Sequence, residues 1–278
     1  MLDAGLYVVA TPIGNLKDIS ERALEVLSEA DVIACEDTRV SKKLFSLIGL
    51  KADKQFICYE DHNEEDKAQA VADLILEGLA VALISDAGSP LISDPGYKLV
   101  RLCRQKGIAV KTIPGASAVI CALQLSGLPT NRFMFAGFIP NKEKAKNDLF
   151  EELCPLKTTL VFYETALRLA KTLETLSKYT ATREIAVARE ITKIYEECKN
   201  GTALELLEYY KQNPPKGEIV LMVAPPEKQE FCAQDIKEEL KKQLKKTGVK
   251  SAVQEVVQKF GGSKKEIYRL ALELKNDE

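Results

Sequence analysis

The sequence contains one histidine, His62, among 278 residues. Histidine is the commonest zinc ligand and the usual base of a catalytic triad, so this scarcity argues against a histidine-rich metal site and against Ser-His-Asp chemistry. The seven cysteines are scattered, odd in number and never spaced as Cys-x-x-Cys. We therefore expect no metal, and we expect most of the cysteines to be small core residues.

Long apolar runs and the common phosphate-binding signatures are also missing. No apolar stretch approaches the ~20 residues that a membrane span needs, and residues 1–5 lead into a strand without a charged leader. The chain has no G-x-G-x-x-G, no Gly-Lys pair and no G-x-S-x-G. These absences exclude the usual dinucleotide fingerprint, a P-loop and a nucleophile elbow, and we expect a cytoplasmic protein.

Basic charge is concentrated near the C-terminus. Residues 237–269 hold ten Lys or Arg against four Asp or Glu, which leaves 29 against 37 in the rest of a chain whose net charge is −2. Such a segment can attract a polyanion, although a solvated helical face has the same composition. We expect helices over 251–260 and from 263 onward, joined at Gly261 and Gly262. This pattern fits a helix-turn-helix or an ordinary corner between two helices.

Five apolar runs in the first 115 residues alternate with helical patterns. They predict strands over 6–10, 31–35, 55–59, 79–84 and 108–113. Strands that alternate with helices are typical of a parallel sheet covered by helices, and right-handed crossovers bring the loops after the strands to one edge. That edge is the expected functional one.

A second set of strands is predicted over 133–137, 159–163, 184–189 and 218–224, with helices over 166–178 and 203–211. We predict an α/β fold with domains over 1–115 and 116–226 and a basic helical tail over 227–278. Between the first two strands of this set, residues 141–147 are polar and rich in lysine, and we expect a mobile surface loop there.

Residues 85–96 form the most distinctive loop of the chain. They follow the uncharged run 79–84, Gly88 permits close approach to a ligand, and Asp94 with Pro95 is typical of a helix start. Loops at the carboxyl ends of parallel strands commonly hold ligands. A tight connection between strand and helix would produce the same pattern, so both interpretations stay open.

Several segments together resemble one family. The segments that carry this resemblance are residues 7–19, 36–39, 61–64, 85–96, 114–115, 127–129, 162–164 and 188–190. In this order they resemble the tetrapyrrole-methylase superfamily, and 11–15 and 36–39 resemble its ribosomal RNA branch. The sequence departs from the family pattern at Ala10, where proline is common, at Ser89, where threonine is usual, and at 116–117, where a Pro-Cys pair is found.

The resemblance implies a class III methyltransferase, with S-adenosylmethionine bound in a cleft between two α/β domains of a homodimer. It also implies 2′-O-methylation of a cytidine ribose in the decoding region of 16S rRNA, within the small ribosomal subunit. The residues that it implies for the cofactor are Ile13, Asp86, Ala87, Gly88, Ser89, Leu91, Ser117, Ala118, Phe162, Tyr163, Ala188 and Arg189. For Phe162 and Ala188, which are flanked by apolar strand residues, core packing is the alternative.

A ribose hydroxyl is a poor nucleophile near neutral pH, so a neighbouring base would help. The candidates on the expected functional edge are Glu36, Asp37, Asp61, His62 and Glu190, with Arg39 and Arg189 placed to hold phosphate. Residues 36–39 could instead cap a helix, and His62 could be a solvated loop residue. The lysines expected to contact RNA, together with Arg39, are Lys142, Lys144, Lys146, Lys241, Lys242, Lys245, Lys246, Lys264 and Lys265.

Two other functions fit the same fold. One is methylation of a small molecule such as a corrin precursor, or of a modified protein side chain, for which a basic tail would be unnecessary. The other is a non-catalytic RNA-binding assembly factor, which the intact loop at 85–96 argues against.

Overall fold

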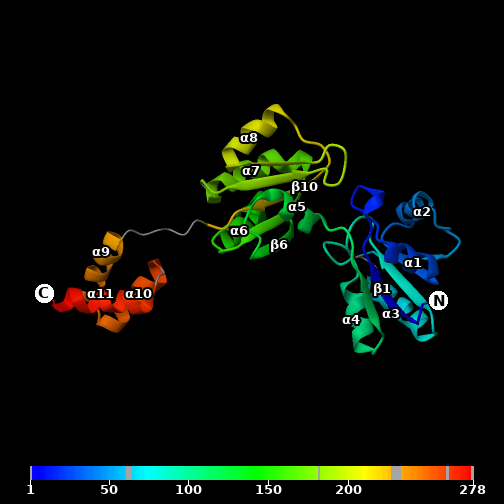
Figure 1. Ribbon diagram of the computed structural model, residues 1–278, viewed down its shortest axis with the longest axis horizontal. Helices are drawn as coiled ribbons and strands as arrows, with labels where there is room; N and C mark the ends of the chain where they lie inside the picture. The colour runs from blue at the N-terminus through cyan, green and yellow to red at the C-terminus, as the bar shows by residue number, and fades with distance from the viewer. Residues whose placement is uncertain (1, 61–63, 181, 227–232, 261–262, 277–278) are drawn as a thin grey trace. The chain divides into compact units, whose positions relative to one another are not determined.

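The structure, a computed structural model, describes residues 2–60, 64–180, 182–226, 233–260 and 263–276. It divides into two compact units, Met1–Pro226 and Glu227–Glu278 (Figure 1). Two of the candidate catalytic residues, Asp61 and His62, lie outside the described residues. The unit that ends at Pro226 contains two five-stranded sheets, and the C-terminal unit is helical.

The first sheet is parallel, as predicted, with strand order β3-β2-β4-β1-β5. Its strands are β1 (Gly5–Val9), β2 (Val32–Cys35), β3 (Gln55–Cys58), β4 (Ala80–Ile84) and β5 (Val110–Ile113). Strand β4 is buried at every position and lies at the centre of the sheet. The loop that follows it therefore starts from the most enclosed strand of this sheet.

Helices cover both faces of this sheet, because its strands carry apolar side chains on both sides. The helical elements of this part are η1 (Leu16–Asp18), α1 (Glu21–Glu29), α2 (Thr38–Leu47), α3 (Glu64–Leu76) and α4 (Tyr97–Gln105). Helices α1 and α2 pack on the face of Val9 and Ile33, whereas α3 and α4 pack on the face of Leu6 and Leu83.

The second sheet is mixed, with order β6-β7-β10-β8-β9, and only the β6–β7 pair is parallel. Its strands are β6 (Phe133–Phe138), β7 (Thr159–Thr165), β8 (Ile185–Arg189), β9 (Glu197–Gly201) and β10 (Glu218–Val223). Its helices are α5 (Ala118–Ser126), α6 (Glu143–Leu153), α7 (Ala166–Thr180) and α8 (Ala203–Gln212). Helices α6, α7 and α8 cover one face, and α5 packs on the other.

The predicted surface loop over 141–147 is wrong. Helix α6 begins at Glu143, and Lys146 lies on the buried face of this helix, only 2% exposed. The sequence pattern misled because the segment is mostly polar, whereas the apolar residues that anchor the helix, Phe150 and Leu153, lie beyond it. Strand β9 was also missed, since residues 197–201 lack an apolar alternation.

Two helix starts differ from their predictions, and a third matches an alternative considered from the sequence. Helix α4 follows Gly96, whose φ of +135° suits glycine, and therefore Asp94 and Pro95 belong to the loop. Ser251 lies inside its helix, which begins at Val249. Helix α2 is capped by Asp37, whose carboxylate accepts a hydrogen bond from the Arg39 amide, so residues 36–39 do cap a helix.

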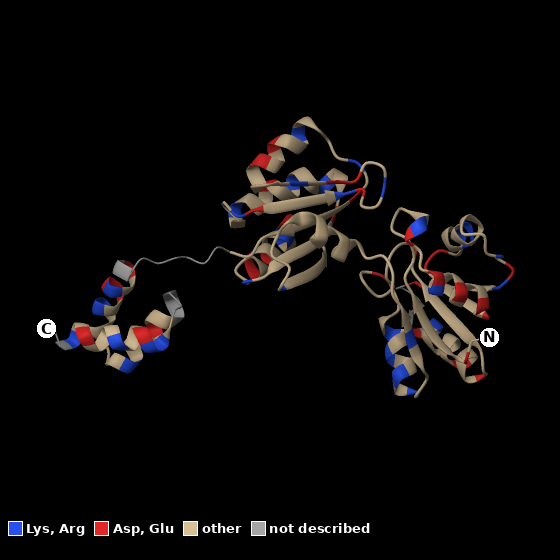
Figure 2. Cartoon of the chain, viewed as in Figure 1, with Lys and Arg blue, Asp and Glu red and all other residues tan. Residues whose placement is uncertain are grey.

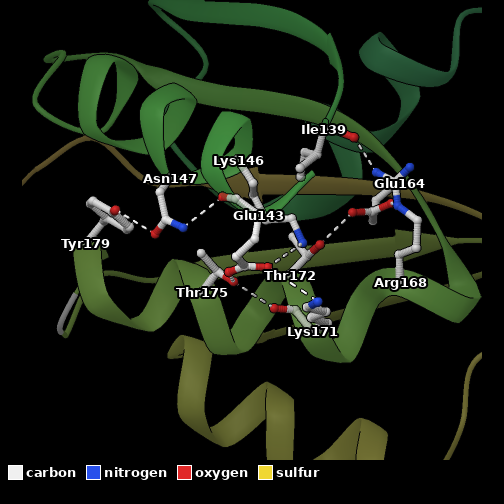
Figure 3. A network of polar contacts seen from close by, with 10 residues as sticks. All are labelled: Ile139, Glu143, Lys146, Asn147, Glu164, Arg168, Lys171, Thr172, Thr175 and Tyr179. Atoms are coloured by element: carbon white, nitrogen blue, oxygen red, sulfur yellow. Dashed lines mark hydrogen bonds and ion pairs between the residues drawn. The ribbon is translucent and has the colours of Figure 1, made fainter. Parts of the chain in front are cut away.

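Buried polar groups connect β7, α6 and α7 (Figure 3). The Glu164 carboxylate, which is fully buried, accepts a hydrogen bond from Thr172 Oγ1 at 2.6 Å and pairs with Arg168 Nε at 2.8 Å. Glu143 accepts a hydrogen bond from Thr175 Oγ1 at 2.8 Å, and Lys146 Nζ lies 4.0 Å from the Glu143 carboxylate. These contacts hold the two helices in register against the strand.

The C-terminal unit consists of α9 (Ala233–Leu244), α10 (Val249–Phe260) and α11 (Lys264–Asn276). Its own core includes Leu240, Val253, Val256 and Ile267. Basic segments recur along these three helices (Figure 2). In the described part of the chain, we find no helix that combines the length and the apolar character needed to cross a bilayer.

Candidate functional site

A cavity of about 220 Å³ lies in the unit Met1–Pro226. Its wall is formed by the loops after β1 and β4, the start of α5, the ends of β6 and β7, the residues just after β8, and the start of β10, which pairs with the end of β8. The residues that line it are Ile13, Ala87, Gly88, Ser89, Ile92, Ser93, Asp94, Ser117, Ala118, Phe138, Tyr163, Glu164, Thr165, Glu190, Ile191, Gly217, Glu218, Ile219 and Val220.

The loop after β4 is held against the loop after β1 by backbone contacts. The Thr11 amide donates to the Gly88 carbonyl at 2.8 Å, and the Gly88 amide donates to the Thr11 carbonyl at 3.2 Å. Gly88 has a φ of +84°, and a Cβ there would lie 3.2 Å from Ile13 Cγ2. The glycine thus permits both the turn and the close approach of this loop to the cavity wall.

Small residues form the wall at the start of α5. The Ser89 hydroxyl donates to the Ala116 carbonyl at 3.2 Å, which ties the β4 loop to this helix start. Ser117 is the N-cap, but its side chain makes no capping hydrogen bond. The first amides of α5 therefore remain available to an anionic or polar ligand group, which the helix dipole favours.

Tyr163 and Phe138 supply the aromatic rings among the lining residues, and Tyr163 has the more extensive ring contacts. It packs edge-on against Phe135 and Phe138, with centroid distances of 4.8 and 5.2 Å. Burial, together with the charges of Asp94 and Glu218, raises the pKa of Tyr163 to about 12. Its hydroxyl therefore stays protonated near neutral pH and can donate a hydrogen bond.

Glu190 and Glu218 hold the ammonium group of Lys193 at the edge of the cavity. Lys193 Nζ lies 3.1 Å from Glu190 Oε1 and 3.6 Å from Glu218 Oε2. Glu190 has a φ of +50°, unusual for a residue with a side chain, and its carboxylate lies against Gly217, where a Cβ would be 1.9 Å from Glu190 Oε1. The glycine leaves the space that this carboxylate occupies.

Seven of the twelve residues expected to bind the cofactor line this cavity: Ile13, Ala87, Gly88, Ser89, Ser117, Ala118 and Tyr163. The other five do not. Leu91 packs toward the core of α3 and α4, and Arg189 pairs with Glu197 at 2.6 Å. Phe162 and Ala188 are fully buried, with Phe162 on the α6 side of the sheet, which is the core alternative considered from the sequence.

Asp86, the fifth of these, connects two strand ends. Its carboxylate accepts a hydrogen bond from the Asp37 amide at 3.3 Å. Burial raises its pKa, and the nearby Asp37 charge adds to this effect against the opposing hydrogen bond. Asp86 therefore positions residues 36–39 beside the β4 loop, as expected for loops at one edge of a parallel sheet.

Asp37 and Arg39 pair with each other. Arg39 Nη2 lies 2.6 Å from Asp37 Oδ2, and hydrogen bonds from the Arg39 side chain and amide lower the pKa of Asp37 to about 2. Such a carboxylate is a weak base near neutral pH. Neither Glu36 nor Asp37 lines the cavity, so among the described candidate bases Glu190 alone does.

The lysines expected to contact RNA fall into two groups. Lys142 and Lys144 are exposed, as are the six lysines of the C-terminal unit, namely Lys241, Lys242, Lys245, Lys246, Lys264 and Lys265. Lys146 lies on the buried face of α6 and is not available to a polyanion.

Several residues that line the cavity were not predicted from the sequence. Phe138, Gly217 and Glu218 carried no signal of their own, because β10 and the end of β6 meet the β4 loop only through the tertiary fold. The sequence pattern places Asp94 at a helix start rather than at a ligand site. Glu164 and Glu190 belong to segments that carry the family resemblance, and for Glu164 this resemblance is the signal in the sequence that points to the site.

Comparisons with known proteins agree with this geometry. The sequence profile of the tetrapyrrole (corrin/porphyrin) methylases matches residues 5–207. A protein of Rickettsia prowazekii is 49% identical over 224 residues, which cover 81% of this chain and 79% of that protein. A protein of Erythrobacter litoralis is 48% identical over 274 residues, which cover 99% and 96%. Both are named ribosomal RNA small subunit methyltransferase I.

Among solved structures, diphthine synthase superposes with a TM-score of 0.61 at 17% identity, over 79% of this chain and 89% of that one. This likeness shows the fold. The profile match over most of the chain and the relatives that are 48–49% identical establish more: the chain belongs to the tetrapyrrole methylase family.

Proposed function

We propose that this protein methylates the 2′-hydroxyl of a cytidine ribose in the decoding region of 16S rRNA, with S-adenosylmethionine as donor. The observation that carries the proposal is the cavity lined by residues 87–89, which we name the donor cavity. It lies in a chain whose relatives over almost its full length are named small subunit rRNA methyltransferases. The donor, the acceptor nucleotide and the ribosomal subunit as partner all belong to this proposal.

The residues of the cavity fit the donor. Gly88 leaves a space that a Cβ would narrow, Ala87 and Ala118 are small, and the free amides at the start of α5 suit a carboxylate. Ile13 and Ile219 offer apolar surface, while Tyr163 offers a ring for packing and a hydroxyl for hydrogen bonding. When bound, S-adenosylmethionine supplies an electrophilic methyl group on a sulfonium centre.

The chain itself mainly binds, orients and excludes water, because methyl transfer from a sulfonium needs no metal or covalent enzyme adduct. The rigid backbone pairing between Thr11 and Gly88 fixes one wall, and the Ser89 contact with Ala116 fixes the next. A fixed wall keeps the donor in line with the acceptor.

The acceptor hydroxyl must lose a proton, and Glu190 is the described candidate base that lines the cavity. Its carboxylate is held by Lys193, which also pairs with Glu218. In this proposal Glu190 accepts the ribose proton, and the Lys193 ammonium orients the carboxylate.

The basic C-terminal unit supplies the cationic surface for the phosphate backbone in this proposal. The exposed lysines on and after α9 and on α11 carry that role. The homodimer implied by the family resemblance, and the cytoplasmic location expected from the missing apolar runs, stay predictions.

The test is methyl transfer from labelled S-adenosylmethionine to small ribosomal subunits that lack 2′-O-methylation, with free 16S rRNA and a corrin precursor as competing acceptors. We expect label on one cytidine ribose, and we expect Glu190→Gln to lower kcat at least tenfold while the donor affinity stays unchanged. Label on the corrin precursor alone would favour a small-molecule methylase. Donor binding with no label on any acceptor would favour an assembly factor.

A further inference from the structure

A second cavity, of about 490 Å³, opens where the end of β8 and the start of β9 meet the segment after α8. This volume falls within the ~300–1,000 Å³ typical of ligand sites. Its wall combines aromatic, proline and charged side chains, chief among them Arg189, Tyr195, Tyr209, Tyr210, Pro215 and Lys216. Nothing in the donor site described above uses these tyrosines.

The tyrosines differ in exposure in a way that suits a stacking site. Tyr195 is 73% exposed at the mouth, whereas Tyr209 is half-buried and packs edge-on against Tyr210 with 5.0 Å between ring centroids. Lys199 Nζ lies 3.9 Å from the centroid of the Tyr209 ring. Aromatic rings beside cations are the usual means by which proteins hold unpaired nucleobases.

Tyr210 adds an independent sign of a ligand. Its side chain is 3% exposed, and its hydroxyl has no hydrogen-bond partner among the described residues. A buried hydroxyl without a hydrogen-bond partner is energetically unfavourable, and buried polar groups in folded proteins are usually paired. The Tyr210 hydroxyl is therefore suited to a hydrogen bond with a bound ligand. Burial raises the pKa of Tyr210, and therefore the hydroxyl stays protonated and can donate.

Cationic groups lie beside these rings. Arg189 is held by Glu197 at 2.6 Å and is 23% exposed, and Lys216 is exposed on the opposite segment. Both line the cavity. A guanidinium and an ammonium at one mouth favour an anionic ligand group such as a phosphate.

The second cavity adjoins the donor cavity. Glu190 lines both, and it follows Arg189 directly in the chain. A group bound among the tyrosines is therefore one side chain away from the place where the acceptor ribose must lie. In a nucleic-acid strand, the group at that separation is the neighbouring nucleotide.

We infer that this tyrosine cavity binds the nucleotide next to the methylated one, in a single-stranded stretch of the RNA. Its base stacks on Tyr195 and Tyr209, its phosphate meets Arg189 and Lys216, and the Tyr210 hydroxyl donates to a base or ribose oxygen. The inference rests on the proposed function for the position of the acceptor.

The test measures RNA contact apart from methyl transfer. A short RNA that contains 4-thiouridine on either side of the acceptor cytidine is photocrosslinked to the full chain, and the linked peptide is identified by mass spectrometry. KM for small subunits and the Kd for S-adenosylmethionine are then measured for Tyr195→Ala and Tyr210→Phe. Ile194→Ala is the matched control, because Ile194 is 94% exposed beside Tyr195 and does not line the cavity.

We expect crosslinks within 189–216 and about a tenfold rise in KM for Tyr195→Ala, with the donor Kd unchanged. Tyr210→Phe should raise KM without lowering Tm, because its hydroxyl has no partner among the described residues. Crosslinks elsewhere, or an unchanged KM in both variants beside an active wild type, would overturn the inference. If the wild type crosslinks here but methylates no ribosomal RNA, the proposed function fails and the RNA site stands.

Discussion

At the scale of single residues, positive backbone φ values gather around the donor cavity. Gly88, Ser93 and Glu190 line it with φ of +84°, +66° and +50°, and Leu91 adds +73° in the same loop. Non-glycine residues adopt such angles only where the surrounding structure holds them there. The strained residues therefore lie in the two segments, after β4 and after β8, that line the cavity.

Replacement of Gly88 by alanine tests that geometry. The added Cβ meets both an unfavourable φ and the Ile13 side chain at 3.2 Å. We expect a loss of stability of about 1 kcal/mol and at least a tenfold weaker donor Kd, measured by thermal denaturation and calorimetric titration. Gly49→Ala is the control, because Gly49 has a φ of +76° with open space around it. Equal donor Kd values for the two variants would contradict the assignment of this loop to the donor.

Asp37 offers a prediction on pH. Its pKa in the folded chain, about 2, is below the ordinary value of 3.8, so folding favours the ionised form. The resulting stability is present above pH 3.8 and is lost as the pH falls toward 2. An NMR titration should find the lowered pKa in the wild type and a higher pKa in Arg39→Ala, which loses the side-chain hydrogen bonds but keeps the backbone amide of residue 39. An ordinary pKa in both proteins would mean that the pairing is absent in solution.

At the scale of elements, buried polar contacts decide how β7, α6 and α7 fit together. Glu164 starts from β7, reaches the α7 side of the sheet and accepts hydrogen bonds from Thr172 and from the Thr165 amide (Figure 3). A buried carboxylate is tolerated only where such donors surround it. The same end of β7 lines the donor cavity, so this network fixes the position of one part of the cavity wall.

Substitutions at two threonines of α7 distinguish the hydrogen bonding of the Glu164 carboxylate from ordinary packing. Thr172→Val removes a donor from the buried Glu164 carboxylate, and we expect a loss of about 2 kcal/mol in the free energy of unfolding. Thr180→Val, equally buried in the same helix, removes only a hydrogen bond to the Leu176 carbonyl and should cost below about 1 kcal/mol. Chemical denaturation of both variants measures the difference, and equal losses would remove the special role of Glu164.

At the scale of the whole molecule, charge is divided between two units that each have their own core. Residues 237–269 carry the excess of basic charge, whereas the rest of the chain is acidic. Figure 2 shows basic positions along all three helices of the C-terminal unit. An acidic unit joined to a basic one suits the polyanionic substrate of the proposed function, because binding to phosphates is governed by local rather than net charge.

Neutralisation of the exposed lysines on and after α9 tests this division. Substitution of Lys241, Lys242, Lys245 and Lys246 by glutamine should weaken RNA binding and reduce its dependence on salt, because each lost phosphate contact removes part of the counterion release. The same change at Lys43, Lys51, Lys157 and Lys211, also exposed, serves as control. RNA binding measured over a series of salt concentrations gives the slope, and equal slopes for both sets would assign the tail a different role.

The sequence by itself determined the parallel first sheet and most of the strands, and its resemblance to a family implied seven of the residues around the donor cavity. The sheet and strands depend on local patterns, such as the buried run of β4 and the loop that follows it, which the order of residues records directly. The α6 helix, the buried Lys146 and strand β9 could not be read in the same way, because tertiary burial overrides a polar local pattern.

Only the tertiary structure decided which residues meet at the two cavities. It placed Phe162 in the core and Tyr163 at the donor site, since neighbouring residues of a strand face opposite sides of a sheet. It also brought Glu190, Lys193 and Glu218 together, and it gathered one tyrosine from the segment before β9 and two from α8 beside them. Contacts between residues distant in the chain depend on how strands pair and helices pack, and no local stretch of sequence records them.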